Sequence, residues 1–155
     1  MSDSETASAP VTSSVDVGRA TPILRVSDLD ASLAYYADTL GFAHEWRALG
    51  FASVRRGKGS IMLCEGDQGH LGAWIWIAVS DADALYAELG TRGAIIRHPP
   101  TNYPWGSREL HVADPDGNVL RFGSDRKPGE PMGEWLDGSG ARWAPTADGG
   151  WRAVE

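Results

Sequence analysis

Residues 73–84 have the sequence AWIWIAVSDADA, and this segment indicates how the whole chain is organised. Its first half alternates, so that Trp74 and Trp76 lie on one face and the two isoleucines on the other, which is the period of a β-strand. Ser80 is a favourable helix N-cap, and the residues after it predict a helix. We therefore expect a strand that leads through a serine cap directly into a helix.

The end of this segment is a near copy of an earlier one. Residues 26–31 (VSDLDA) match residues 79–84 (VSDADA) at every position but the fourth. A repeat that falls twice at a strand-to-helix junction indicates two copies of one supersecondary unit. We therefore predict two tandem modules, residues 21–66 and 73–123, within one domain.

Each module is predicted to run strand, helix, strand, strand, strand, which is an α+β arrangement. In the first module an apolar stripe of Leu29, Leu33, Tyr36 and Leu40 predicts a helix over 28–40. The expected strands are 21–26, 43–48, 51–55 and 60–65, then 73–79, 94–98, 108–113 and 118–122, with a helix at 81–92 and a loop at 99–103. Two such βαβββ units give a concave mixed sheet with helices on one face and a bare face on the other.

The two ends of the chain differ from this domain. Residues 1–20 have little to bury and predict a disordered arm. Residues 124–155 are rich in Gly and Pro and carry Trp135, Trp143 and Trp151 at intervals of eight. We expect these tryptophans to fix a C-terminal extension to the body of the protein.

Composition excludes several classes of function. The net charge is -7, from 21 acidic and 14 basic side chains among 155 residues, which argues against nucleic acid as the main partner. There is no run of 18 apolar residues to span a membrane and no secretory signal, so a cytoplasmic location is expected. A lone cysteine, Cys64, excludes an intrachain disulfide.

Several short motifs are similar to those of a known superfamily. They are residues 40–42 (LGF), 73–77 (AWIWI), 104–106 (PWG) and the turn at 114–118 (DPDGN). Through them the chain resembles the vicinal oxygen chelate superfamily of glyoxalase I and the extradiol dioxygenases, and within it the bleomycin resistance proteins, which bind a drug without catalysis. The resemblance implies the glyoxalase/bleomycin resistance fold and a symmetric homodimer with two identical grooves at its interface.

Metal-using members of that superfamily carry His, Glu, His and Glu at the bare-face ends of four strands. In this sequence the corresponding positions fall at Thr21, near Glu65, at Trp74 and at Arg121. Only one of these can ligate a metal, and a guanidinium would repel the cation. We therefore expect no metal, no other cofactor and no catalytic residue.

The bare face is the predicted ligand groove. Trp74 and Trp76 share the parity that points into it, and His111, which alternates with apolar neighbours, is the one histidine expected to face the cavity. Indole walls suit planar aromatic and cationic groups. The alternative is that the two tryptophans only fill the gap between the sheets. The candidate ligand-binding residues are Trp74, Trp76, Tyr36, Trp46, Phe51, Trp105, Glu109, His111 and Arg121.

The function that this sequence predicts is sequestration of a small, aromatic, cationic antibiotic of bleomycin type. The first alternative is a glyoxalase- or dioxygenase-like enzyme of the same superfamily with an altered metal site. The second is an interaction or biosynthetic accessory protein that uses the Trp-rich extension. The expected partners are the small molecule and a second copy of the chain, with neither nucleic acid nor membrane.

Overall fold

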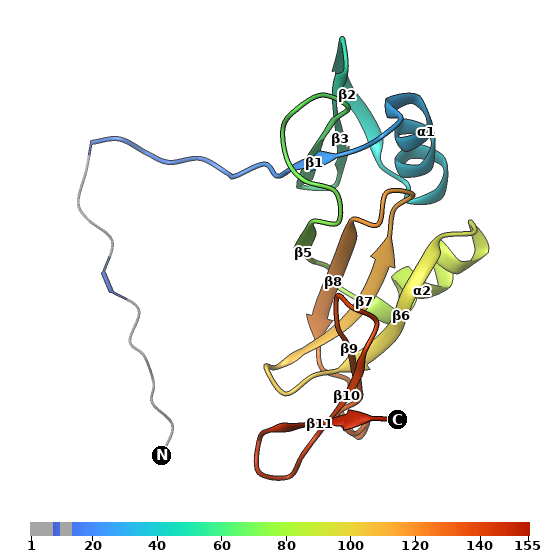
Figure 1. Ribbon diagram of the computed structural model, residues 1–155. Helices are drawn as coiled ribbons and strands as arrows, with labels where there is room; N and C mark the ends of the chain where they lie inside the picture. The colour runs from blue at the N-terminus through green and yellow to red at the C-terminus, as the bar shows by residue number, and fades with distance from the viewer. Residues whose placement is uncertain (1–7, 10–13) are drawn as a thin grey trace.

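The computed structural model of the protein describes residues 8–9 and 14–155. Much of the predicted disordered arm, namely residues 1–7 and 10–13, lies outside the described residues. The described residues 14–20 are exposed and extend away from the body (Figure 1), and close to β1 the Arg19 guanidinium donates a hydrogen bond to the Lys58 carbonyl over 3.2 Å.

The first module contains four strands and one helix, which follow one another in the predicted order. They are β1 (Ile23–Arg25), α1 (Leu29–Ala34) continued by the π-helical turn η1 (Tyr35–Thr39), β2 (Ala43–Ala48), β3 (Phe51–Arg56) and β4 (Gly59–Cys64). The sheet order is β1-β4-β3-β2, with β1 parallel to β4 and the other pairs antiparallel.

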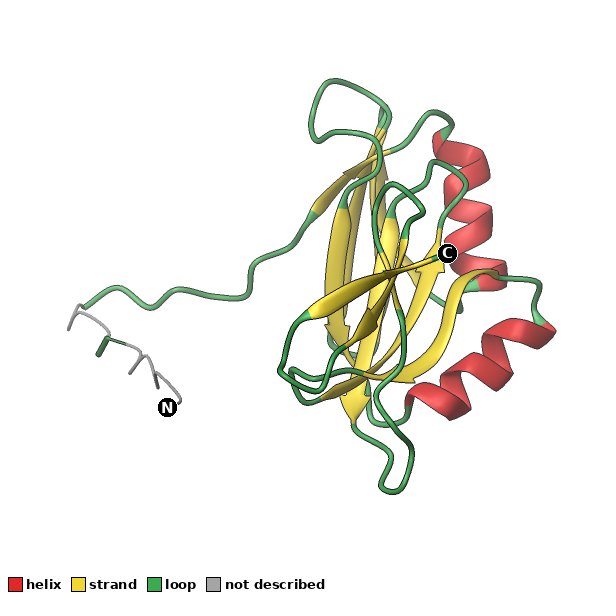
Figure 2. Ribbon diagram, turned by 60° about the horizontal axis from the view of Figure 1, so that its bottom comes forward, coloured by secondary structure: helices red, strands yellow, loops and turns green. Residues whose placement is uncertain are grey.

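The second module repeats this arrangement. Its elements are β5 (Trp74–Ala78), α2 (Ala82–Thr91), β6 (Ile95–Asn102), β7 (Ser107–Ala113) and β8 (Val119–Asp125). The order β5-β8-β7-β6, with β5 parallel to β8, is that of the first sheet. Both helices lie on the same side of the two sheets (Figure 2). The predicted α+β fold of two βαβββ modules is confirmed.

The helix caps lie one residue later than predicted. Asp28 and Asp81, rather than the serines before them, adopt the extended cap conformation, and their carboxylates accept the N–H of Ala31 and Ala84, each over 3.0 Å. A carboxylate satisfies a free N–H of the first turn and also interacts favourably with the helix dipole. The repeated Ser-Asp pair therefore marks both junctions, but its second residue makes the cap.

The loop predicted at 99–103 is wrong, because β6 continues as a strand to Asn102. The two prolines at 99 and 100 do not end it, since β6 is an edge strand and its pairing with β7 shifts register on either side of His98. At an edge, and at such irregularities, a missing N–H removes no hydrogen bond that the sheet needs.

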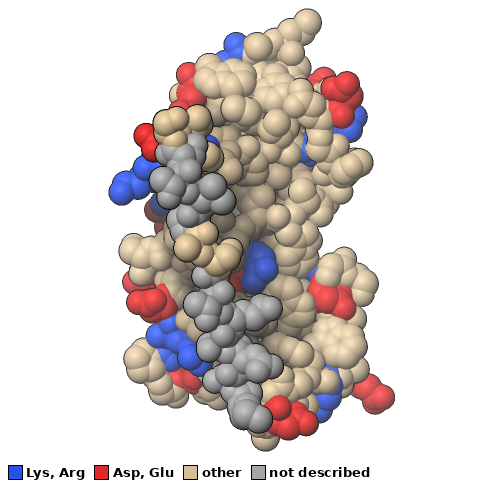
Figure 3. All heavy atoms as spheres, turned by 90° about the vertical axis from the view of Figure 1, so that its left-hand side faces the viewer, with Lys and Arg blue, Asp and Glu red and all other residues tan. Residues whose placement is uncertain are grey.

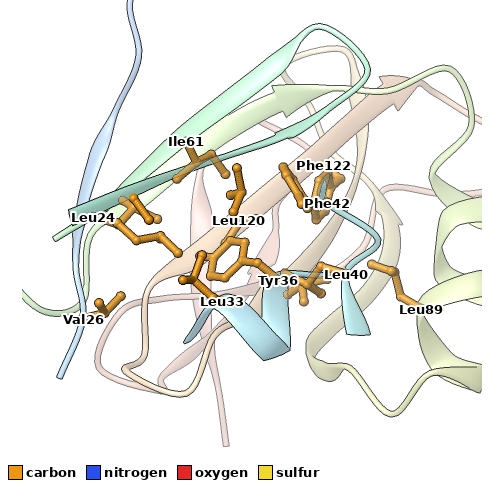
Figure 4. Packing of buried hydrophobic residues seen from close by; sticks show 14 of the residues in the cluster. Leu24, Val26, Leu33, Tyr36, Leu40, Phe42, Ile61, Leu89, Leu120 and Phe122 are labelled. Atoms are coloured by element: carbon orange, nitrogen blue, oxygen red, sulfur yellow. The ribbon is translucent and has the colours of Figure 1, made fainter. Parts of the chain in front are cut away.

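One hydrophobic core joins the two modules (Figure 4). Tyr36, predicted as a groove residue, lies in this core instead: it is fully buried, and its hydroxyl donates to Asp114 Oδ2 over 3.0 Å. The turn at 114–118 closes the contact, because Asn118 donates to the Arg25 carbonyl of the first module over 3.0 Å. This turn motif therefore holds the modules together.

Strand β5 divides its side chains as the alternation predicted. Ile75 and Ile77 pack against the core, while Trp74 and Trp76 lie on the face away from it. The C-terminal extension adds a small antiparallel sheet of β9 (Trp135–Leu136), β10 (Arg142–Pro145) and β11 (Trp151–Val154), in the order β11-β10-β9. It crosses the face of the second sheet opposite α2 (Figures 1 and 2). No helix of the described residues is long and apolar enough to cross a membrane.

Candidate functional site

A buried carboxylate lies at the centre of the concave face of the second sheet. Glu109 of β7 is fully buried and accepts hydrogen bonds from four side chains. Its two oxygens accept from Arg121 Nε (2.7 Å) and Nη2 (3.0 Å), His111 Nε2 (3.0 Å), Trp105 Nε1 (2.6 Å) and Ser107 Oγ (2.6 Å). Burial raises the pKa of this carboxyl, but the hydrogen bonds to its charged form lower it more, and the net pKa lies well below the ordinary value.

His111 is the buried neutral partner of this carboxylate. It is fully buried, and burial lowers its pKa despite the opposing effect of Glu109, so that a neutral ring donates through Nε2. Its Nδ1 is buried and has no hydrogen-bond partner among the described residues. The ring lies against Tyr103 at 5.9 Å and Trp135 at 5.1 Å between centroids. His98 is partly buried beside it, with the two ring centroids 6.2 Å apart.

Arg121 connects the carboxylate to the aromatic side chains. Its Cζ lies 5.1 Å from the Trp135 ring centroid and 5.7 Å from that of Trp105, both within cation–π range. The Arg121 side chain is 26% exposed, whereas the Glu109 side chain is not exposed. Arg121 is therefore a compensated cation on the floor of the site, with indoles above it.

The extension covers a large part of the face predicted to be open. Trp135 lies 5.8 Å from Trp74, 5.5 Å from Tyr103 and 5.4 Å from Trp105, measured between ring centroids. The face around Trp74 and His111 is consequently closed by the chain's own indole. The sequence placed Trp135 in a pinning extension, but nothing in it indicated which surface this tryptophan would cover.

An open cavity remains beside Trp135. It has a volume of about 550 Å³ and is lined by Trp105, Arg121, Trp135, Asp137, Trp143 and Trp151. Trp105 is half exposed, and Trp151 lies 6.1 Å from it at an interplanar angle of 42°. This is the size and apolar character of a small-molecule site.

The structure brings together Trp74, Trp105, Glu109, His111 and Arg121 from the predicted set. Trp46 and Phe51 instead stack on each other in the first sheet, 5.8 Å apart and nearly parallel. Trp76 is half exposed and lies flat over Gly123 of β8, where an added Cβ would meet the indole at 2.5 Å.

Sequence reasoning missed three contributors, Arg97, Tyr103 and Trp135. Arg97 donates to the Leu136 carbonyl over 2.8 Å and to that of Asp137, and its Cζ lies 4.7 Å from the Trp74 ring centroid. Tyr103 was placed in a loop, although the PWG motif that follows it was a signal for this region. The regular spacing of the tail tryptophans was the signal for Trp135.

Three of the four positions that correspond to metal ligands in the superfamily that the sequence resembles carry side chains that are engaged elsewhere or cannot ligate a metal. Glu65 accepts the N–H of Leu29 over 2.7 Å, Trp74 presents an indole, and Arg121 presents a guanidinium. No three His, Cys, Asp or Glu side chains of the described residues gather where they could hold an ion. The chemistry that the site offers is stacking and hydrogen bonding.

Comparison with known proteins agrees with this geometry. A family model described as the Glyoxalase/Bleomycin resistance protein/Dioxygenase superfamily matches residues 17–122. A bleomycin resistance protein of Geobacillus stearothermophilus is 32% identical in an alignment of 123 residues that covers 65% of this chain and 92% of that protein.

Solved structures give the same result. The bleomycin-binding protein of bleomycin-producing Streptomyces verticillus, in complex with copper(II)-bleomycin, has a TM-score of 0.62 at 30% identity, over 72% of this chain and 99% of that one. The bleomycin resistance determinant encoded on the transposon Tn5 has a TM-score of 0.60 at 25% identity, over 72% and 100%. With its duplicated βαβββ modules and a match over most of its length, this chain belongs to the Glyoxalase/Bleomycin resistance protein/Dioxygenase superfamily.

Proposed function

We propose that this protein binds and sequesters a small, aromatic, cationic antibiotic of bleomycin type, with no metal of its own and no chemical change to the drug. The observation that carries the proposal is the indole-walled cavity over the Arg121–Glu109 pair. Its relatives include proteins named for bleomycin resistance and bleomycin binding. Sequestration requires tight binding only, and the site supplies stacking surfaces for it.

The preference for a cation rests on charge. The chain carries a net charge of -7, which attracts a cationic ligand at long range. On the side of the molecule away from the helices, uncharged residues predominate, Asp and Glu lie near the edges together with Lys and Arg, and a basic patch lies near the centre (Figure 3). A ligand with an aromatic part and a positive part would place the first against the indoles of the cavity and the second outside it, toward carboxylates near the edges.

The proposal that no metal takes part is supported by the side chains at the four superfamily positions. An indole and a guanidinium replace two of the usual ligands, and the Glu65 carboxylate is engaged at a helix N-terminus. At position 121 a positive charge stands where a metal ligand would be, and this charge is paired with the buried Glu109 carboxylate.

We also propose that the protein acts as a homodimer in the cytoplasm, where it would meet the drug before an intracellular target. Half-exposed Trp46 and Trp76 and fully exposed Leu49 are apolar groups that a second copy would cover. Sedimentation at micromolar concentration should give one dimeric species. A monomer that still binds the drug would contradict the dimer without affecting sequestration.

The test of function is resistance without conversion. Expression in a bleomycin-sensitive bacterium should raise the inhibitory concentration, and the drug recovered from purified protein after denaturation should have an unchanged mass. A Trp105→Ala variant of the same abundance should give less protection. Protection with a modified drug would favour the enzyme alternative, and no protection would contradict the proposal.

A further inference from the structure

The C-terminal extension lies beyond the 17–122 segment that the family model matches, yet it supplies much of the cavity wall. Trp135, Trp143 and Trp151 come from the extension, and Trp105 and Arg121 come from the second module. The cavity therefore exists only because the two parts pack together. Three indoles in one short extension, all directed to the same space, exceed what attachment of a tail requires.

The extension wall is held rigidly. The Trp143 indole donates to Asp137 Oδ2 over 2.9 Å, and the other oxygen of Asp137 accepts the N–H groups of Ser139 and Ala141, each over 2.9 Å. Arg97 holds the neighbouring backbone through the Leu136 carbonyl. Walls fixed before binding lose little entropy when a ligand enters.

Attachment and binding are divided between different tryptophans. Trp135 packs against Trp74, Tyr103 and His111, and thus carries the contact with the body. Trp151 is 37% exposed, and its ring lies 6.1 Å from that of half-exposed Trp105, measured between centroids. These two partly exposed rings form the mouth of the cavity.

The charges around the cavity determine which part of a ligand suits it. The Arg121 cation is compensated by Glu109, and the Asp137 carboxylate already accepts the indole N–H of Trp143 and the N–H groups of Ser139 and Ala141. Arg121 already lies against the rings of Trp105 and Trp135, so the electron-rich faces of these indoles are partly used. An uncharged planar ring gains from such walls, while a cationic group gains little.

We propose that the extension forms a second wall of the ligand site, a slot that takes an uncharged planar heteroaromatic group of the antibiotic and leaves its cationic part outside. This inference rests on the proposed function for the identity of the whole ligand, but the slot itself is independent of it. Trp143, Trp151 and Trp105 are the stacking surfaces, and Trp135 is the positioning residue that anchors them.

Two probes separate the inference from the proposed function. The first is bleomycin, measured by calorimetric titration. The second is quinoline, a small planar ring that is neutral at pH 7.5, followed through the indole N–H signals of ¹⁵N-labelled protein. The variants are Trp151→Ala and, as matched control, Tyr86→Ala, which removes a 39% exposed aromatic residue of α2.

Quinoline should shift the indole signals of Trp143 and Trp151, and Trp151→Ala should weaken both probes about tenfold, as expected for a stacking contact, while Tyr86→Ala changes neither. Quinoline binding in the slot without bleomycin binding would leave the inference intact and remove the proposed function. Bleomycin binding that Trp151→Ala does not weaken would overturn the inference alone. Tighter binding of bleomycin by a Trp135→Ala variant would also overturn the inference, because the extension would then block the ligand site instead of forming its wall.

Discussion

Replacing Glu109 by Gln tests the charged centre of the site. Gln keeps the shape of the side chain but removes the negative charge and turns one acceptor oxygen into a donor, opposite Arg121 and Trp105, which can only donate. His111 is fully buried and cannot turn to water, whereas Arg121 and Trp105 are partly exposed and can rehydrate in part. Loss of one partner from a buried ion pair costs about 3–5 kcal/mol, and the exposure of Arg121 favours the lower value, about 3 kcal/mol.

The free energy of unfolding is measured by urea denaturation, where that loss lowers the midpoint at unchanged slope. For a chain of this size it corresponds to a fall in Tm of roughly 6–12 °C. The double variant Glu109→Gln/Arg121→Met removes both charges together while keeping an amide oxygen as acceptor for the buried His111, and it should recover part of the stability lost in the single variant. A cost of Glu109→Gln below about 1 kcal/mol, or a double variant less stable than the single one, would refute the reasoning.

Three further predictions concern neighbouring residues. Ile75→Ala should lower the free energy of unfolding by about 2 kcal/mol, because Ile75 packs on the core. Trp74→Ala should lower both the stability and the affinity for bleomycin, because the Trp74 ring contacts Trp135 and Arg97. Equal affinity of wild type and Trp74→Ala in a titration would contradict this. Burial lowers the pKa of His98 and His111, so below about pH 6.5 the unfolded chain binds more protons than the folded one and the free energy of unfolding should fall. It should fall further below about pH 4.3, because the pKa of Glu109 is also lowered in the folded protein. Equal urea midpoints at pH 7.5 and 5.5 would be inconsistent with buried neutral histidines. Gly123→Ala should displace the Trp76 indole and change the near-ultraviolet circular dichroism spectrum. The matched control Gly90→Ala, in open space on α2, should leave that spectrum unchanged and stabilise the protein by about 0.5–1 kcal/mol. An unchanged spectrum for Gly123→Ala would mean that Trp76 lies elsewhere.

The fold was accessible from the sequence because local patterns and tertiary structure agree. The repeated Ser-Asp junction and the alternation of β5 each depend on only a few neighbouring residues. Where the predicted fold was wrong, the structure depends on contacts between residues that are distant in sequence. The strand through the two prolines depends on β6 being an edge strand, which no local pattern of residues 95–102 reveals.

The site was less accessible, since it depends on which surface the extension covers. Parity correctly placed Trp74 on the face away from the core. For Tyr36 the apolar helical stripe was the correct guide and the groove assignment was wrong, because the side chain lies in the core and donates a hydrogen bond to Asp114, far along the chain. Likewise, the pairing of Arg121 with Glu109 follows from their position on adjacent strands. The closure of this face by Trp135 requires the three-dimensional path of the tail.

Sequestration requires that the protein binds the drug and leaves it unmodified. The most direct measurement is a calorimetric titration of the metal-depleted full-length protein with bleomycin, followed by mass analysis of the recovered drug. We predict saturable binding with a Kd below about 1 µM, equivalent to about -8 kcal/mol, and a drug of unchanged mass. An absence of saturation up to about 1 mM drug, equivalent to about -4 kcal/mol, or recovery of a chemically altered drug, would contradict sequestration.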